Sequence, residues 1–226
     1  MPPETRLTNT LPLLLHIATT ITGLIDAISY LALGHVFTAN MTGNVVFLAF
    51  AVVGVPGLSL TRSLTALVAF MIGALIGGGV ATRLAEVSTR WITTALTLES
   101  ALLLVATLAA INFRDSSGSL FQLYLIIVLT ALAMGIRNAT VRKLGIADLT
   151  TTVLTLTITG LAADSRFAGG TNPRWRRRLL AVLLMFFGAA MGTLLLRHSL
   201  LLPLATATLL SICCVAISMK QRSDVR

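Results

Sequence analysis

The apolar run LPLLLHIATTITGLIDAISYLAL, from Leu11 to Leu33, decides the fold. A transmembrane helix needs about 20 mainly apolar residues, and this run supplies that length with a single charged residue, Asp26. The residues before it carry one Glu and one Arg, and nothing in them marks a cleaved signal peptide. We therefore predict a retained first transmembrane helix.

The composition of the whole chain also indicates a membrane protein. Of its 226 residues, 56% are hydrophobic and only 11% are charged, and the mean hydropathy is +0.91. An ordinary soluble domain carries roughly 25% charged residues, so this chain cannot cover itself with a water-facing surface. The net charge of +9 comes from basic residues between apolar blocks, as in cytoplasmic loops, so we expect no nucleic-acid partner.

Five further stretches resemble membrane spans, and two more are weaker. The five are Ser63–Thr82, Trp91–Ile111, Leu120–Ile136, Leu179–Leu196 and Leu200–Met219. Of the weaker two, Val36–Leu60 is interrupted by Gly54, Pro56 and Gly57, and Leu149–Leu161 is short and rich in threonine. We predict an all-α polytopic membrane protein forming one domain, residues 1–226, with six transmembrane helices and two short or re-entrant helical segments.

The distribution of basic residues decides between six and eight spans. With six spans and a cytoplasmic N-terminus, 14 of the 17 Lys and Arg residues lie inside, and only Arg62, Arg114 and Arg197 lie outside. With eight spans the division is 11 inside and 6 outside, out of the same 17. The positive-inside rule therefore favours six spans, with both termini cytoplasmic.

The two halves of the chain, about 11–111 and 120–219, resemble each other. Gly23–Ala27 matches Gly135–Ala139 at an offset of 112 residues, and the pair Gly73 and Gly77 matches Gly188 and Gly192 at an offset of 115. Each half holds three predicted spans, so we expect a repeat inverted across the membrane plane. Glycines four residues apart share one helix face, and we assign these four to close helix packing.

Few polar residues lie at membrane depth, and these are the candidates for a solute or ion pathway. Asp26 and Glu99 fall within predicted spans, where a carboxylate either marks an ion path or makes a structural hydrogen bond. The cluster of Asn40, Thr42 and Asn44 either coordinates a solute or caps a helix beginning near Thr42. Asn138 is the repeat equivalent of Asp26 and is placed in the same pathway.

Two groups of arginines are assigned mainly to topology. Arg137 could pair with Asp26 or Glu99, but its default interpretation is a marker of the cytoplasmic end of its helix. The cluster beside Trp175 precedes a span and is interpreted as a topology anchor or a site for anionic lipid headgroups; it comprises Arg174, Arg176, Arg177 and Arg178. Cys213 and Cys214 are neighbours in an apolar run, so we expect neither a disulfide nor a metal site.

The runs Gly23–Tyr30 and Phe37–Asn44 resemble the YoaK-like family of bacterial inner-membrane proteins. Gly135–Arg142 is similar to the second signature of that family. The resemblance covers nearly the whole chain and implies several membrane spans but no activity, because the family is a domain of unknown function. In the second half Leu156 stands where glycine follows threonine in Thr42-Gly43, so the two weak segments are not fully equivalent.

These features favour a small secondary transporter or channel for a small polar or ionic solute. The alternative is a non-transporting membrane scaffold, or a subunit that binds a partner or lipid. No nucleotide-binding, hydrolase or metalloprotease motif is present, so we expect neither an enzyme nor a cofactor. The partners that we expect are the bilayer, a small solute or ion, and a second copy in a homodimer.

Overall fold

The computed structural model describes residues 3–84, 88–111, 113, 119–145 and 154–223, and in these residues every regular element is helical. Six helices are long and apolar enough to cross a membrane: α1 (Pro3–Ala32), α3 (Leu60–Arg83), α4 (Ser88–Ala109), α5 (Leu120–Leu144), α7 (Trp175–Leu196) and α8 (Leu201–Ser223). Two short apolar helices accompany them, α2 (Met41–Val52) and α6 (Leu154–Ala163), and a 3₁₀ turn covers Arg166–Ala168. The predicted all-α membrane fold is confirmed.

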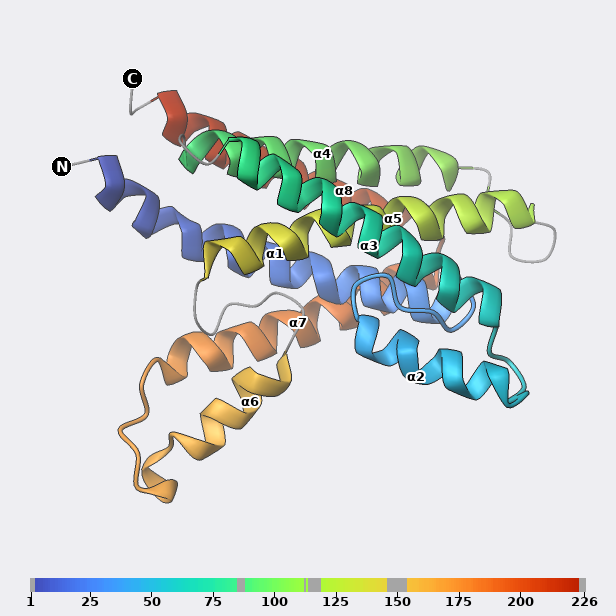
Figure 1. The fold of residues 1–226 in the computed structure, drawn as a ribbon, viewed down its shortest axis with the longest axis horizontal. Coiled ribbons are helices and arrows are strands. Elements are labelled where there is room, and N and C mark those ends of the chain that lie inside the picture. The colour runs from blue at the N-terminus through green and yellow to red at the C-terminus, as the bar shows by residue number, and fades with distance from the viewer. Residues whose placement is uncertain (1–2, 85–87, 112, 114–118, 146–153, 224–226) are drawn as a thin grey trace.

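The helices α2 and α6 are too short to cross a bilayer. At 1.5 Å per residue they are about 18 Å and 15 Å long, roughly half of the hydrocarbon thickness. Helix α1 ends and α3 begins at the same end of the bundle, and the end of α5 and the start of α7 share the opposite end (Figure 1). Residues 149–153 of the predicted second weak segment lie outside the described residues.

Helix α5 runs eight residues beyond the predicted end at Ile136. The prediction ended the span there because the charged Arg137 follows. In the structure Arg137 is buried and paired with Glu99, and the helix continues to Leu144. The helix then ends in the usual way, with two basic residues in its last turn and Gly145 in the left-handed conformation at φ 61°. Helix α7 likewise begins at Trp175, before the predicted Leu179.

Helices of one half pack mainly on helices of the other. The most extensive contacts join α1 to α7 and α3 to α5. The remaining contacts come in corresponding pairs, since α4 packs on α5 as α8 packs on α1, and α2 packs on α3 as α6 packs on α7. Helices α1 and α5 run in opposite directions through the centre of the bundle (Figure 1).

Glycines allow the backbones to approach at the two largest contacts. A Cβ atom on Gly23 would lie 2.7 Å from the Ala189 nitrogen, and one on Gly135 would lie 2.8 Å from the Ala74 nitrogen. Gly188 faces the Thr20 carbonyl, and Gly73 faces the Leu132 carbonyl. The contact partners recur at the offsets of 112 and 115 residues that relate the two halves of the sequence.

The apolar core lies where α1 and α5 are surrounded by the other spans. Leu24, Ile25 and Ile28 of α1 and Ile126 and Met134 of α5 are 0% exposed. By contrast, α3 and α7 present large apolar side chains outward, including Phe186 and Phe187. In a bilayer such a face contacts lipid, so the inside of this protein is the place where a buried polar group needs an explanation.

Candidate functional site

An ion pair between Glu99 of α4 and Arg137 of α5 lies in the middle of the bundle. The Arg137 Nε donates to Glu99 Oε2 at 3.0 Å, and its second terminal nitrogen pairs with Glu99 Oε1. The two residues are only 1% and 3% exposed. Glu99 stands about 16 Å from the start of α4, close to the middle of the helix. The default interpretation of Arg137 as the marker of a helix end is therefore wrong.

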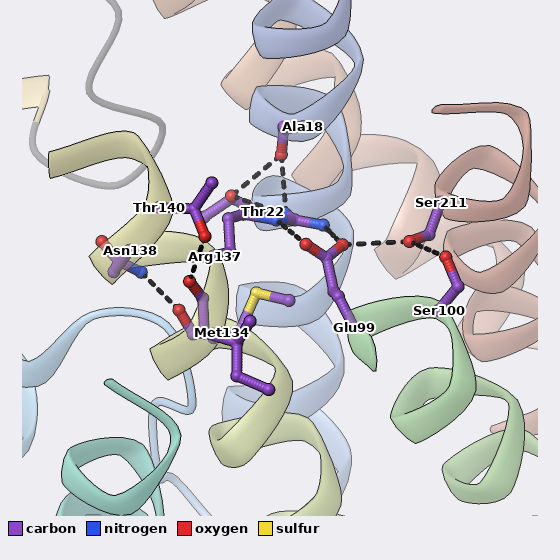
Figure 2. A network of polar contacts seen from close by, with 10 residues as sticks. Ala18, Thr22, Glu99, Ser100, Met134, Arg137, Asn138, Thr140 and Ser211 are labelled. Atoms are coloured by element: carbon purple, nitrogen blue, oxygen red, sulfur yellow. Dashed lines mark hydrogen bonds and ion pairs between the residues drawn. The ribbon is translucent and has the colours of Figure 1, made fainter. Parts of the chain in front are cut away.

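The ion pair belongs to a network that joins four spans (Figure 2). From α1, the Ala18 carbonyl and the Thr22 hydroxyl accept from Arg137 Nη1 at 2.9 Å and 3.2 Å. From α8, the Ser211 hydroxyl donates to Glu99 Oε1 at 3.0 Å. Ser211 also shares a hydrogen bond of 2.7 Å with Ser100 of α4. Both charges are thus hydrogen-bonded on more than one side, as buried charges require.

Sequence reasoning missed the hydroxyl groups of this network, although a periodic signal was present. Thr93, Ser100 and Thr107 are spaced by seven residues and therefore share one face of α4. Their hydroxyls pair with those of α8: Thr93 with Ser218 at 2.6 Å, and Thr107 with Thr208 at 2.8 Å. These pairs fix α4 against α8 and hold Glu99 at their centre.

Asp26 carries a buried oxygen with no hydrogen-bond partner among the described residues. This atom is Oδ1. Asp26 lies one turn before Tyr30 on the same side of α1, and the Tyr30 ring stacks on Phe37 with centroids 5.3 Å apart. The Thr38 hydroxyl nearby in the sequence is also buried without a partner in this part of the chain. An unsatisfied buried carboxylate oxygen is costly, and such groups often have a functional reason.

The predicted cluster after α1 is mainly structural in its contacts. The Asn44 side chain accepts from the Phe37 amide at 2.9 Å and donates to the Phe37 carbonyl, closing the turn that leads into α2. Asn40 is the N-cap of α2, and its side chain accepts from the Gly43 amide at 3.3 Å. Thr42 is exposed. The structure therefore supports the capping interpretation for Asn40, and it does not join these residues to the network around Glu99.

Changing asparagine to aspartate is expected to have different effects on stability at Asn44 and at Asn40. Asn44→Asp is expected to lower the midpoint of thermal unfolding in detergent, because a carboxylate cannot donate to the Phe37 carbonyl. The expected cost is about 1–3 kcal/mol. Asn40→Asp serves as the matched control and is expected to be neutral, because aspartate accepts from the Gly43 amide as well as asparagine does. Equal midpoints for the two variants would contradict the assignment.

Asn138 points away from the ion pair (Figure 2). Its Nδ2 donates to the Met134 carbonyl at 2.8 Å, one turn back on α5. The adjacent Thr140 hydroxyl donates in the same way to the Ile136 carbonyl. Asn138 matches Asp26 in the sequence repeat, but its side chain bonds to its own helix. Its role in a solute pathway stays a prediction.

The arginines at the start of α7 divide into two groups. Arg174 and Arg176 are exposed, and the Arg176 guanidinium lies 5.6 Å from the centre of the Trp175 ring. Such positions suit the anchoring role that the sequence predicts for them. Arg178 differs, because it is buried and donates to the Gly160 carbonyl and to the Asp164 carboxylate, both at 2.7 Å. Arg178 therefore holds α6 against α7. Arg177 is half-buried.

A small cavity lies beside the ion pair, on the side where α1 and α4 begin and α5 ends. It measures about 30 Å³ and lies between α1, α4 and α5. Its walls are apolar side chains such as Leu14, Ile92 and Val141, and Glu99 and Arg137 also line it. A cavity needs about 10–15 Å³ to hold one water molecule, so this one has room for about two.

Comparison with known proteins gives a family and a relative. The family model described as "Protein of unknown function (DUF1275)" matches residues 14–217. The UPF0700 transmembrane protein YoaK of Bacillus subtilis (strain 168) is 40% identical over 145 residues, which cover 63% of this chain and 61% of that protein. The match thus spans less than two thirds of the length of this relative. No solved structure matches the chain.

Proposed function

The chain belongs to the DUF1275 family, and we propose that it acts as a small secondary transporter or channel for a small polar or ionic solute. The resemblance to YoaK-like proteins is confirmed, and with it the assignment as a multi-pass membrane protein. Neither match names an activity, so the proposal rests on the arrangement of polar groups inside the bundle.

The observation that carries the proposal is the charged network at mid-depth. Ionisable residues within membrane spans are costly, face the bundle interior and mark ion or substrate paths in many transporters. Glu99 and Arg137 meet this description, and a small cavity lies beside them. Leucine and isoleucine alone could fill the interior of the bundle without the cost of burying charge. The presence of charged and hydroxyl groups where four spans meet therefore favours a solute path.

The pairing of the two halves supports the same proposal. We interpret the corresponding helix contacts and the opposite directions of α1 and α5 as an inverted repeat. Secondary transporters are often built from such repeats, with the substrate site near the midplane at the repeat interface. Ser100 and Ser211, which bond to each other, come from α4 and α8, the last helices of the two halves.

The orientation that we propose has both termini in the cytoplasm of a bacterial cell. Six spans return the chain to its starting side, and both termini lie at the same end of the bundle (Figure 1). The excess of Lys and Arg predicted for that side agrees with the positive-inside rule. The cavity beside Glu99 would then lie on the cytoplasmic side of the ion pair.

Flux through reconstituted protein tests the proposal. The full chain is placed in liposomes and screened with inorganic ions, organic acids, amino acids and sugars, with pH-sensitive and voltage-sensitive dyes as readouts. We expect at least one solute to drive a protein-dependent signal, which Asp26→Asn and Glu99→Gln each reduce by at least tenfold. The matched control is Thr97→Val, an exposed position two residues from Glu99 on the same helix.

Two results would count against the proposal. Unchanged flux in both carboxylate variants would show that these residues do not form the path. No flux for any solute, together with a partner protein that co-purifies in a fixed ratio, would favour the alternative of a membrane scaffold or partner-binding subunit.

A further inference from the structure

The Arg137 guanidinium is held by α1 independently of Glu99. Its Nη1 donates to the Ala18 carbonyl at 2.9 Å and to the Thr22 hydroxyl at 3.2 Å. The other edge of the guanidinium, formed by Nε and Nη2, is occupied by the two oxygens of Glu99. The guanidinium would therefore keep its position if the Glu99 carboxylate left that edge.

The surroundings of Glu99 suit a neutral as well as a charged carboxyl group. In the charged form Glu99 accepts from the Ser211 hydroxyl at 3.0 Å. In the protonated form the carboxyl would donate to the Ser211 oxygen, and the Ser211 hydrogen would turn toward Ser100, 2.7 Å away. Both forms thus satisfy the same two serines, because a hydroxyl both donates and accepts.

Neutralising Glu99 would leave the Arg137 charge in need of another anion. An arginine side chain cannot be deprotonated in a protein, and an unpaired charge in the bundle interior costs several kcal/mol. Arg137 and Glu99 both line the cavity of about 30 Å³, so space next to the ion pair is available to an incoming anion. Nε and Nη2 present two parallel donors in one plane, which match two oxygens of a planar anion.

We propose that Glu99 and Arg137 form a coupled site for one small planar monovalent oxyanion, a short monocarboxylate or nitrate, together with one proton. The anion binds the Nε and Nη2 edge of Arg137, and Glu99 takes up one proton from the surrounding solution. The net charge of the site stays the same, because one negative charge replaces another. This inference rests on the proposed transport function and names its substrate class and its coupling ion.

The described part of the chain holds one such site, because the other half lacks both charged residues. In the other half Ile25 stands at the position of Arg137, at the offset of 112 residues. Leu210 stands at the position of Glu99, in the register set by Ser100 and Ser211. Ile25 belongs to the buried apolar core, and Leu210 packs against that core. The expected stoichiometry is therefore one anion and one proton per chain.

The ionisable groups around Glu99 are few. Helix α5 contributes Arg137, and α8 contributes the buried Cys214 thiol, three residues after Ser211. Helix α1 contributes the neutral Thr22 and Ala18 groups, with Asp26 one turn further along the helix. Glu99 is thus the group in direct contact with Arg137 that can change its charge when an anion enters.

Proton uptake on anion binding tests the site without measuring transport. The full chain in detergent and weak buffer is titrated with sodium nitrate while an indicator dye reports pH, and sodium sulfate keeps the ionic strength constant. Nitrate carries no proton near neutral pH, so any proton uptake comes from the protein. We expect uptake to approach one proton per chain at saturation, and nitrate and acetate to raise the unfolding midpoint.

Two variants test anion binding and proton uptake separately. Glu99→Gln should still be stabilised by nitrate but should take up no proton, whereas Arg137→Gln should show neither effect. Thr97→Val should behave like the unmodified protein. If either of the first two variants fails to fold, the stoichiometry of proton uptake in the unmodified protein still decides the result.

The outcomes distinguish this inference from the proposed function. Absence of nitrate-dependent and acetate-dependent stabilisation, or proton uptake that survives Glu99→Gln, overturns the inference. Flux of a cation or sugar in liposomes without oxyanion binding overturns it as well, while the transport function stands. Oxyanion binding with proton uptake, but without flux of any solute, supports the site and overturns transport.

Discussion

Replacing Arg137 with isoleucine is expected to lower the free energy of unfolding by about 3–5 kcal/mol. The variant leaves the Glu99 carboxylate 1% exposed, and among the described residues only the Ser211 hydroxyl, at 3.0 Å, still donates a hydrogen bond to it, while the positive charge that balanced it is lost. Unfolding is followed by SDS titration in mixed micelles, with circular dichroism and the fluorescence of Trp91 and Trp175 as readouts.

A double variant separates the cost of the orphaned charge from the loss of packing. Arg137→Ile with Glu99→Leu removes both charges and copies the residues that the other half carries, Ile25 and Leu210. Replacing a buried ion pair by apolar residues is often neutral or stabilising, so most of the lost stability should return. This folded, uncharged variant should nevertheless show no flux and no proton uptake on nitrate binding.

Two outcomes would contradict this prediction. A double variant as unstable as Arg137→Ile would mean that packing of the arginine stem, and not the charge balance, dominates the effect. A stable single variant would mean that Glu99 is already neutral or finds another partner. Thr97→Val, on the exposed side of α4, should stay within about 0.5 kcal/mol of the unmodified protein.

The glycines at the two largest helix contacts should be almost as sensitive. Gly73→Ala and Gly188→Ala are each expected to cost about 1–3 kcal/mol, because the new methyl group would meet a backbone carbonyl that moves only with its helix. Gly192→Ala should cost less, since its nearest neighbours are the Ala27 Cβ at 3.0 Å and the Leu24 carbonyl at 3.2 Å. The same SDS titration measures all three.

Gly78 provides the matched control within α3. A Cβ atom there would have no neighbour within 4 Å, so Gly78→Ala should raise the stability slightly through its better helix propensity. The predicted difference in sign between Gly73→Ala and Gly78→Ala tests the helix contact directly. If both changes raise stability, the approach of α3 to α5 is not as close as the structure has it.

The number and kind of the elements could be predicted from the sequence because lipid imposes a simple rule. Each span needs about 20 apolar residues, and interruptions such as Pro56 and Gly57 shorten a helix. The same reasoning misplaced the end of α5, because it treated Arg137 as a residue that must reach the membrane surface. A rule about single charges cannot foresee that two charges far apart in the chain will neutralise each other.

The candidate site was predicted in part, for a similar reason. Glu99 was recognised as a buried carboxylate, and the glycine spacing pointed to the faces where α1 meets α7 and α3 meets α5. The sequence could not choose between Asp26 and Glu99 as the partner of Arg137. It also left open whether Asn44 faces a solute or closes its own turn, which the structure answers with two hydrogen bonds to Phe37.

The sequence by itself determined that this protein lies in a membrane, with six spans, two short helices and two similar halves. That information is local, because hydropathy, helix length and glycine spacing are properties of neighbouring residues. Only the tertiary structure decided that α4 and α5 bring Glu99 to Arg137, and that α1 and α8 complete the network. The physical reason is that a buried charge is satisfied by whichever groups the packing of distant helices places within hydrogen-bond reach.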